Sequence, residues 1–298
     1  MTQRRYAFVQ LDVFTDRAFG GNQLAVFTDA RGLSTEEMQT LTREMNYSES
    51  TFVLPAETSD TAARVRIFTP AIEMPMAGHP TVGTAWWLTQ SGVLTGESAH
   101  LGLNIGPVRI DIDRETDGSP RFIWMTHRLP EFGRVRHDRD VVAAALGVTA
   151  DDLRQDLPLQ EVSTGVPFLY VPFASLEALG RARVNPSALR DLWPNSEPRM
   201  VYLFTPHGDG LRARMFAPHV ADIPEDPATG AAAGPMAAYA VHYGLKPDGG
   251  FIIDQGVEMG RPSRIHVNAR RIGGAFVEIK IGGQAVVVGE GHIYWEAR

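Results

Sequence analysis

An internal repeat at about half the chain length constrains the fold of this 298-residue chain more than any other feature. Residues 64–70 (RVRIFTP) align with residues 212–218 (RARMFAP), and residues 79–85 (HPTVGTA) align with residues 226–232 (DPATGAA). Both matches occur in the same order and at nearly the same separation. Self-similarity of this kind is typical of an architecture built from repeated units. The repeat therefore predicts two lobes of similar structure.

Each matching block is typical of a strand, a turn and a helix. Residues 64–69 and 212–217 alternate charged and apolar side chains, which is the period of a half-buried strand. Pro80 and Pro227 suit the first turn of a helix, where a missing N–H costs nothing. Small apolar residues follow both prolines, so we expect two helices, at residues 82–88 and 230–243, that are buried on most faces.

The lobes are predicted to be α+β in class. We place the first lobe in residues 1–120, which the last C-terminal residues could complete, and the second in residues 121–298. A weaker match, of residues 21–27 with residues 165–171, supports this division. The segment 113–121 (DRETDGSPR) is interpreted as a hairpin turn or as the loop that joins the lobes.

The remaining elements follow from hydrophobic periodicity. Ser34, with Glu37 three residues later, matches the capping box of a helix start. Further helices are predicted at residues 34–45 and 138–145. Further strands are predicted at residues 6–14, 22–27, 51–54, 105–112, 121–127, 168–172, 200–204, 264–268, 275–281 and 284–288.

Composition excludes several classes of function. The net charge is -7 and no cluster of Lys and Arg occurs, which argues against a nucleic-acid surface. The chain has no cysteine, so disulfides, thiolate metal sites and thiol nucleophiles are excluded. The histidines lack metal-ligand spacing, and neither a dinucleotide-binding motif nor a P-loop is present. We therefore expect no metal and no cofactor.

The chain also lacks the apolar stretches that membranes require. No run approaches the roughly 18 apolar residues of a membrane span, and the N-terminus has no apolar run of signal-peptide length. We expect a cytoplasmic protein that does not bind membranes.

The loops at the two matched helix starts, residues 77–81 and 225–230, are the strongest candidate site. Duplicated lobes usually place equivalent loops face to face, and clefts between domains are favoured ligand sites. Each loop offers unpaired N–H groups and the positive end of a helix dipole. Two such ends would hold a small anion, most simply a carboxylate. The predicted active site is therefore a cleft between the lobes.

His79 and Asp226 occupy matching positions in these two loops. Two proton-transfer groups that approach a substrate from opposite sides suit a reaction that removes a proton and returns it elsewhere. Taken singly, a histidine here is more often a structural hydrogen-bonding residue, and an aspartate is more often an N-cap. Their joint occurrence favours a functional role.

Three segments carry a resemblance to a known family. Residues 44–53 (EMNYSESTFV), 77–85 (AGHPTVGTA) and 225–235 (EDPATGAAAGP) closely resemble the signature segments of the phenazine-biosynthesis isomerase (PhzF-like) family. Residues 12–14 (DVF) and 19–22 (FGGN) also look like that family. The resemblance runs from about residue 6 to the C-terminus, in order and at the expected spacing.

The resemblance implies a diaminopimelate-epimerase-like fold, with two pseudo-symmetric lobes that each wrap a mostly antiparallel sheet around a central helix. It implies an isomerase that moves a hydrogen between carbons without a cofactor, and typically a homodimer. By the match, Glu49 becomes the principal acid/base, with His79 and Asp226 as the other catalytic residues. A carboxyl group in a dry cleft suits that role physically, because burial raises its affinity for protons. The residues expected to bind substrate are Gly78, Thr81, Thr229, Gly230 and Ala231.

Two departures from related proteins affect this interpretation. The type enzyme of the family carries a serine where this chain has Ala231, so one hydroxyl donor is lost and the substrate's polar groups could differ. Phenazine synthesis itself is therefore doubtful. Racemases and epimerases of this fold use a cysteine on each loop, and the absence of cysteine rules out such a two-thiol reaction.

Three hypotheses for the function result. The leading one is a cofactor-independent isomerase that acts on a small carboxylate-bearing metabolite, with Glu49 moving the proton. The second is a lyase or hydratase that uses the same groups on a related unsaturated acid. The third is a non-enzymatic protein that binds a metabolite or a partner and has kept the fold.

Overall fold

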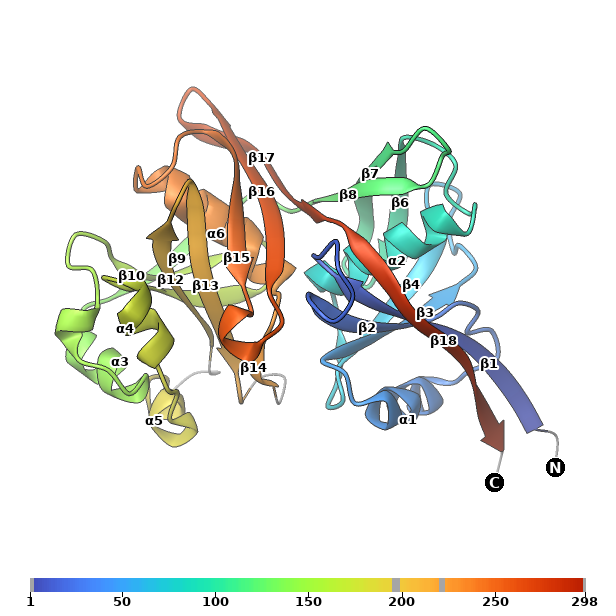
Figure 1. The fold of residues 1–298 in the computed structure, drawn as a ribbon, viewed down its shortest axis with the longest axis horizontal. Coiled ribbons are helices and arrows are strands. Elements are labelled where there is room, and N and C mark those ends of the chain that lie inside the picture. Colours follow the sequence, from blue (N-terminus) through green and yellow to red (C-terminus); the bar gives the residue numbers. More distant parts are fainter. Residues whose placement is uncertain (1–2, 195–198, 220–222, 297–298) are drawn as a thin grey trace. The chain divides into compact units, whose positions relative to one another are not determined.

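The computed structural model of the chain describes residues 3–194, 199–219 and 223–296, which form a mixed α+β fold. It divides into two compact units (Figure 1). The first unit comprises residues 1–126 and 282–298, and the second comprises residues 127–281. Within the described part of the chain, no helix is both long and apolar enough to cross a membrane.

The first unit is built on one mixed sheet. Strand pairing gives the order β18–β1–β2–β3–β4–β6–β7–β8, with the short β5 also paired to β4. The β2–β3 and β4–β6 pairs are parallel, and the other pairs are antiparallel. The strands are β1 (Gln3–Val13), β2 (Asn22–Phe27), β3 (Glu49–Leu54), β4 (Ala63–Phe68), β5 (Glu73–Met74), β6 (Ser98–Leu103), β7 (Gly106–Arg114), β8 (Pro120–Thr126) and β18 (Ala285–Glu296).

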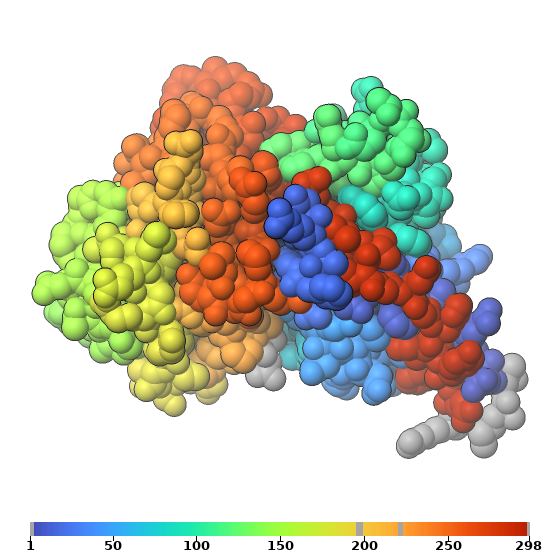
Figure 2. Space-filling view, viewed as in Figure 1, coloured from blue at the N-terminus to red at the C-terminus, as the bar shows by residue number. Residues whose placement is uncertain are grey.

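The C-terminal strand completes this sheet. β18 runs antiparallel to β1 over nearly its whole length, and the two lie side by side on the surface (Figure 2). The segment 113–121 holds the end of β7, a turn at residues 115–119 and the start of the antiparallel β8, so its interpretation as a hairpin is confirmed.

Two helices cover opposite faces of this sheet. α1 (Thr35–Met45) packs over Phe27 and Phe52, and its predicted capping box is present: Ser34 Oγ accepts from the N–H of Glu37 at 3.2 Å, and the N–H of Ser34 donates to the Glu37 carboxylate at 2.8 Å. α2 (Gly78–Gln90) is buried along most of its length against β1, β2, β3 and β8. Gly83 permits this close approach, because a Cβ there would lie 2.7 Å from the side chains of Leu24 and Val13.

The second unit has a similar arrangement. Its strands pair in the order β9–β10–β11–β12–β13–β15–β16, with β14 also paired to β13. The β11–β12 and β13–β15 pairs are parallel. The strands are β9 (Glu131–Arg136), β10 (Leu159–Ser163), β11 (Pro167–Pro172), β12 (Met200–His207), β13 (Gly210–Ala217), β14 (Ile223–Asp226), β15 (Gly249–Gln255), β16 (Ser263–Ile272) and β17 (Ala275–Gly283).

One long buried helix, α6 (Gly230–His242), packs against β10 and β16 of this sheet. The hydroxyl of Tyr170 on β11 donates to the carbonyl of Ala232 at 2.7 Å and ties the sheet to the first turn of the helix. Three shorter helices belong to a separate apolar cluster of the unit that includes Leu169 and Val201. They are α3 (Arg139–Ala145), α4 (Leu176–Arg181) and α5 (Pro186–Asp191).

The helix starts differ in part from the prediction. α2 begins at Gly78, four residues before the Val82 at which we expected regular helix, and Pro80 lies in its first turn as predicted. α6 begins at Gly230, as predicted, with Thr229 as its N-cap, so Pro227 precedes the helix and does not lie in its first turn. The residues between Asp226 and the helix instead form a tight loop that side-chain hydrogen bonds hold.

Candidate active site

Glu49 and His79 lie together in the first unit, although 30 positions separate them in the sequence. Glu49 is the first residue of β3 and His79 is the second residue of α2. Nε2 of His79 lies 3.5 Å from Oε2 of Glu49. Both residues are buried, with 2% of His79 and 9% of Glu49 exposed. Two of the three predicted catalytic residues therefore form one buried pair.

The sheet register explains why Glu49 faces the helix. Successive side chains of a strand point to opposite faces, so Glu49 and Thr51 share a face. The hydroxyls of Thr51 and Thr84 are hydrogen-bonded at 2.8 Å, which fixes that face against α2. Phe52 points the other way, into the core beneath α1. The strand thus presents a carboxylate to the beginning of α2.

Sequence reasoning did not single out Asn22 and Ser48, which extend this pair. Nδ2 of Asn22 lies 3.1 Å from Nδ1 of His79, and the Ser48 hydroxyl donates to Oδ1 of Asn22 at 3.0 Å. Both residues stand at the ends of neighbouring parallel strands, since Asn22 begins β2 and Ser48 precedes β3. Their presence in the family-like segments FGGN and MNYSES was the only available signal.

Burial controls the charge of the histidine. Desolvation lowers the pKa of His79 from 6.5 to about 3, and a backbone hydrogen bond with Gln23 opposes this only in part. The ring is therefore neutral near pH 7. Its contact with Glu49 is that of a neutral imidazole with a carboxyl group, so the 3.5 Å separation does not describe a charged pair.

The first turn of α2 carries two of the predicted substrate-binding residues. Gly78 is the first helical residue, and Ala77 before it offers no side-chain cap, so the N–H groups of this turn receive no capping side chain. The hydroxyl of Thr81 donates to the carbonyl of Ala77 at 2.6 Å, and Thr81 is fully buried. The Thr81 hydroxyl therefore bonds the carbonyl of the residue before the helix, and Gly78 brings backbone donors to the helix start.

The other predicted residues lie in the second unit, at the start of α6. Asp226 is the last residue of β14 and is buried, with 3% exposed. Its Oδ2 accepts from the hydroxyl of Thr229 at 2.5 Å. Gly230 and Ala231 follow as the first two residues of the helix. The structure thus brings Asp226, Thr229, Gly230 and Ala231 together as a second group.

Gln255 holds this second group in place, and sequence reasoning missed it. Its Nε2 donates to the carbonyl of Asp226 at 2.7 Å and to Oγ1 of Thr229 at 2.9 Å. Its Oε1 accepts from the N–H of Thr229 at 3.2 Å and from the hydroxyl of Tyr202 at 3.0 Å. Gly256 follows with φ +75°, and a Cβ there would lie 2.5 Å from the carbonyl oxygen of Pro227. The end of β15 therefore cradles the loop that carries Asp226.

Tyr202, whose hydroxyl donates to Gln255, stays protonated. Burial, reinforced by the negative charge of Asp226, raises the pKa of Tyr202 far above its ordinary value. The phenol therefore stays a hydrogen-bond donor to Gln255 at any physiological pH.

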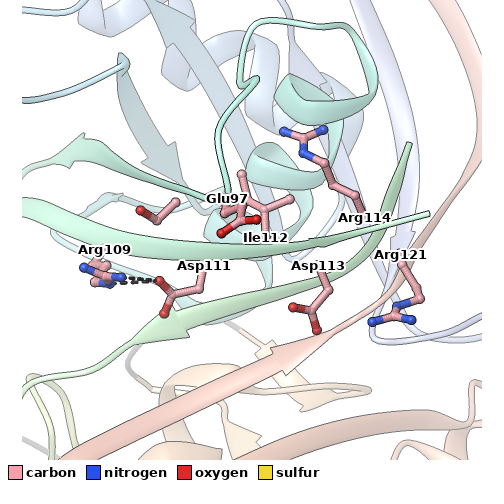
Figure 3. Close-up of a pocket in the computed structure, with 8 residues that line it drawn as sticks. Glu97, Arg109, Asp111, Ile112, Asp113, Arg114 and Arg121 are labelled. Carbon is pink, nitrogen blue, oxygen red and sulfur yellow. Dashed lines mark hydrogen bonds and ion pairs between the residues drawn. The ribbon is translucent and has the colours of Figure 1, made fainter. Parts of the chain in front are cut away.

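Two surface pockets among the described residues lie elsewhere. One lies along β6, β7 and β8 and is lined by charges of both signs, with Arg109 paired to Asp111 at 2.7 Å (Figure 3). The other is lined by Arg214 and Glu225 of the second unit. Neither contains a predicted catalytic residue. In the described ranges, no group of three or more His, Asp or Glu could hold a metal ion.

The sequence is similar to those of known proteins over nearly its whole length. A family profile described as phenazine biosynthesis-like protein (PhzC-PhzF) matches residues 11–291. An uncharacterized isomerase of Mesorhizobium japonicum is 39% identical, over 96% of this chain and 98% of its own length. The trans-2,3-dihydro-3-hydroxyanthranilate isomerase of Pseudomonas aeruginosa is 35% identical, over 97% of this chain and 99% of its own length.

A solved structure also shares the fold over nearly the whole chain. The PhzF-family phenazine biosynthesis protein of Bacillus anthracis superposes with a TM-score of 0.86 at 29% identity, over 97% of this chain and 99% of that chain.

Proposed function

Because this chain belongs to the phenazine biosynthesis-like family and is an isomerase, we propose that it moves a proton on a small carboxylate-bearing metabolite by acid/base catalysis centred on Glu49. In the proposal no cofactor takes part. Glu49 removes the proton and returns it at another carbon, while His79 and Asp226 assist.

The observation that carries the proposal is the buried contact between Glu49 and His79, with 3.5 Å between Nε2 and Oε2. A carboxylate beside a neutral imidazole can accept a proton without leaving an unpaired buried cation. The separation exceeds an ordinary N–H···O distance, as is common before substrate binds. The arrangement suits a proton shuttle that is assembled before the reaction.

Substrate recognition is assigned to the two helix starts. Backbone N–H groups at Gly78, and at Gly230 and Ala231, would hold the substrate's carboxylate, because such groups carry the positive end of the helix dipole. Thr81 and Thr229 shape the loops that present these donors.

The substrate need not be that of the characterised relatives. Two relatives from other pseudomonads also carry the name trans-2,3-dihydro-3-hydroxyanthranilate isomerase. Ala231 offers no hydroxyl where the sequence comparison expected one, so a substrate with one acceptor fewer at this position is proposed.

Duplication of an ancestral lobe is proposed as the origin of the two units. Each unit contains an arginine that pairs with a glutamate on the next short strand: Arg66 with Glu73 at 2.6 Å, and Arg214 with Glu225 at 2.8 Å. Each guanidinium also lies over a phenylalanine two residues on, at 5.2 Å from the ring centre in the first unit and 4.9 Å in the second. A cytoplasmic homodimer completes the proposal, and light scattering would measure its mass.

Label exchange in deuterated water tests the function. The protein is incubated with trans-2,3-dihydro-3-hydroxyanthranilate and with a panel of small cyclic and unsaturated carboxylic acids, and products are followed by NMR and mass spectrometry. Isomerisation moves a proton without a change of composition, whereas a lyase or hydratase changes the mass. Once a substrate is found, Glu49→Gln should abolish turnover and Asp226→Asn should reduce it. Undiminished turnover in Glu49→Gln would sink the assignment.

A further inference from the structure

The hydrogen bonds around Asp226 form a chain whose direction is fixed by two backbone groups. The carbonyl of Asp226 lies 2.7 Å from one end of the Gln255 amide, and the N–H of Thr229 lies 3.2 Å from the other end. A carbonyl oxygen can only accept a hydrogen bond, and a backbone N–H can only donate one. Nε2 of Gln255 must therefore face the carbonyl and Oε1 must face the N–H, so only one orientation of the amide satisfies both groups.

Tyr202 supports the same orientation of the amide. Its hydroxyl lies 3.0 Å from Oε1 of Gln255, and burial keeps the phenol protonated by raising its pKa, so it has a proton to donate there. Both Tyr202 and Gln255 are fully buried. Reversal of the amide would turn its NH2 group toward the N–H of Thr229, and a buried N–H without an acceptor is costly.

The orientation of the amide decides the direction of the next hydrogen bond. Nε2 of Gln255 lies 2.9 Å from Oγ1 of Thr229, and a primary amide nitrogen is only a donor. The Thr229 hydroxyl therefore accepts this bond, and its own proton remains for another acceptor. Oδ2 of Asp226 lies 2.5 Å from Oγ1, so the hydroxyl donates to the carboxyl group.

The reverse direction would leave a buried donor without a partner. If Asp226 carried a proton on Oδ2, that proton would point at Oγ1 of Thr229, which already accepts from Gln255. The hydroxyl proton would then need a different acceptor, and no further partner of this hydroxyl occurs in the part of the chain that the structure describes. Thr229 is buried, so the loss of its acceptor would cost stability.

The charged side chains of the neighbouring strands are paired with one another. Glu225 and Asp226 are adjacent in β14, so their side chains point to opposite sides of the strand. The helix α6 has no charged or titratable residue among its first nine, from Gly230 to Ala238. The ion pairs of β13, β14, β15 and β16 near this loop are Arg214 with Glu225, Arg212 with Glu258 and Arg264 with Asp254. Among the described residues of this unit, Tyr202 is the titratable group that hydrogen-bonds into the chain.

We propose that Gln255 and Thr229 are positioning residues that keep Oδ2 of Asp226 a hydrogen-bond acceptor, so that a proton bound by this carboxyl group is carried on Oδ1. A hydroxyl that donates to a carboxyl group favours its ionised form. Gln255 acts through Thr229, because its donation to Oγ1 directs the hydroxyl proton to Asp226. The direction of the hydrogen bonds rests on geometry alone, and only its catalytic consequence rests on the proposed function.

Removal of the Thr229 hydroxyl tests the direction, because the two directions predict shifts of opposite sign. Carbon NMR of substrate-free, aspartate-labelled protein follows the titration of each carboxyl group, and Asp226→Asn assigns the signal. If Thr229 donates, Thr229→Val removes a bond to the ionised form, and the midpoint of the Asp226 titration should rise by about one pH unit. If Asp226 donates instead, the same variant removes a bond to the protonated form and lowers the midpoint. A lowered or unchanged midpoint would overturn the proposal.

Three further variants separate positioning from packing. Thr229→Ser keeps the hydroxyl and should keep the wild-type midpoint. Thr205→Val is the matched control, because it removes another buried hydroxyl from the same unit, and it should leave the titration of Asp226 unchanged. Gln255→Met should raise the midpoint in the wild type but add nothing in Thr229→Val, since Gln255 acts through the hydroxyl. An equal rise in both backgrounds would contradict that role.

Activity separates this inference from the proposed function. In the proposed function Asp226 assists proton transfer, so the limb of the pH–rate profile that follows Asp226 should move upward by the same amount in Thr229→Val and stay in place in Thr229→Ser. If the titration shifts as expected while Asp226→Asn keeps full turnover, the proposed role of Asp226 fails and the positioning inference stands. If the midpoint falls in Thr229→Val while Asp226→Asn is impaired, the inference fails and the function stands.

Discussion

The starts of the two long buried helices, α2 and α6, differ in the chemistry of the side chains around them. At α2 the helix start faces a carboxylate, an imidazole and an amide, namely Glu49, His79 and Asn22. At α6 the sheet register places apolar residues at the corresponding positions. Leu24 pairs with Glu49 in the first unit, and Phe168 pairs with Met200 in the second.

The pairing of β3 with β4, and of β12 with β13, again aligns Glu49 with Met200. Ser50, which follows Glu49, pairs with Phe68, and Val201, which follows Met200, pairs with Phe216. Asn22 lies two residues before Leu24, as Val166 lies two residues before Phe168. The second unit therefore has methionine in place of the acid and valine in place of the amide.

The strand beside each helix loop shows the opposite difference. There the second unit carries the polar side chain and the first unit the apolar one. Gly102 pairs with Arg64 and is followed by Leu103, whereas Asp254 pairs with Arg212 and is followed by Gln255. The first unit thus has a leucine where the second has an amide with four hydrogen bonds. The start of α2 therefore lies beside a buried carboxyl–imidazole pair, and the start of α6 lies beside an amide that hydrogen-bonds the Asp226 loop.

The largest expected effect comes from exchanging the acid. Glu49→Gln keeps the shape of the side chain but cannot take up a proton, so label exchange should fall by about 10²- to 10⁴-fold. The matched control is Met200→Leu at the corresponding position, a volume-conserving change that should cost less than about 1.5 kcal/mol of stability and leave the rate unchanged. Equal losses of rate in both variants would show that the two positions do not differ in function.

A second prediction concerns the hydrogen bonds of Gln255, which hold the Asp226 loop of the second unit. Gln255→Leu copies Leu103 of the first unit and removes four hydrogen bonds. Buried partners left unpaired cost about 1–3 kcal/mol each before relaxation, so the free energy of unfolding should fall by about 3 kcal/mol. Urea unfolding of this variant and of Leu103→Met measures the contrast, since the control should cost less than about 1.5 kcal/mol. Equal stability of the wild type and Gln255→Leu would show that the hydrogen bonds of Gln255 do not stabilise the protein.

Sequence patterns predicted the elements that carry strong local periodicity. β2 matches its predicted range of residues 22–27, and the capping box at Ser34 is present. Weakly alternating strands were missed, namely β5, β6, β9, β10, β14 and β15. Propensity gives little signal for short strands, because pairing with neighbours distant in sequence stabilises them.

Prediction of the site from the sequence was limited for the same reason. Glu49 and His79 were found as members of motifs, but their contact depends on how β3 packs against α2. Gln255 lies at the end of a strand in no motif, and its four bonds exist only because β15 pairs in parallel with β13. Registers between strands decide such roles, and a single sequence does not encode them as a local pattern.

The smallest expected effect compares the two buried histidines, His79 of the first unit and His127 of the second. Burial lowers their pKa values from 6.5 to about 3 and about 4. Between pH 6.5 and these values the unfolded chain binds a proton that the folded chain does not. Each histidine therefore contributes stability that is complete above pH 6.5 and is lost as the pH falls, by about 1.4 kcal/mol per pH unit.

Replacing either histidine should remove its share of this pH dependence. In His79→Gln and in His127→Gln, the slope of unfolding free energy against pH should be lower by about 1.4 kcal/mol per pH unit between pH 6 and pH 4.5. Urea titrations at half-unit steps of pH measure it. Below pH 4 the two should part, because the share of His127 ends near its pKa of about 4 while that of His79 continues toward about 3. A wild-type slope retained in His79→Gln would mean that the ring is not neutral in the folded protein, and Glu49 would then face an imidazolium.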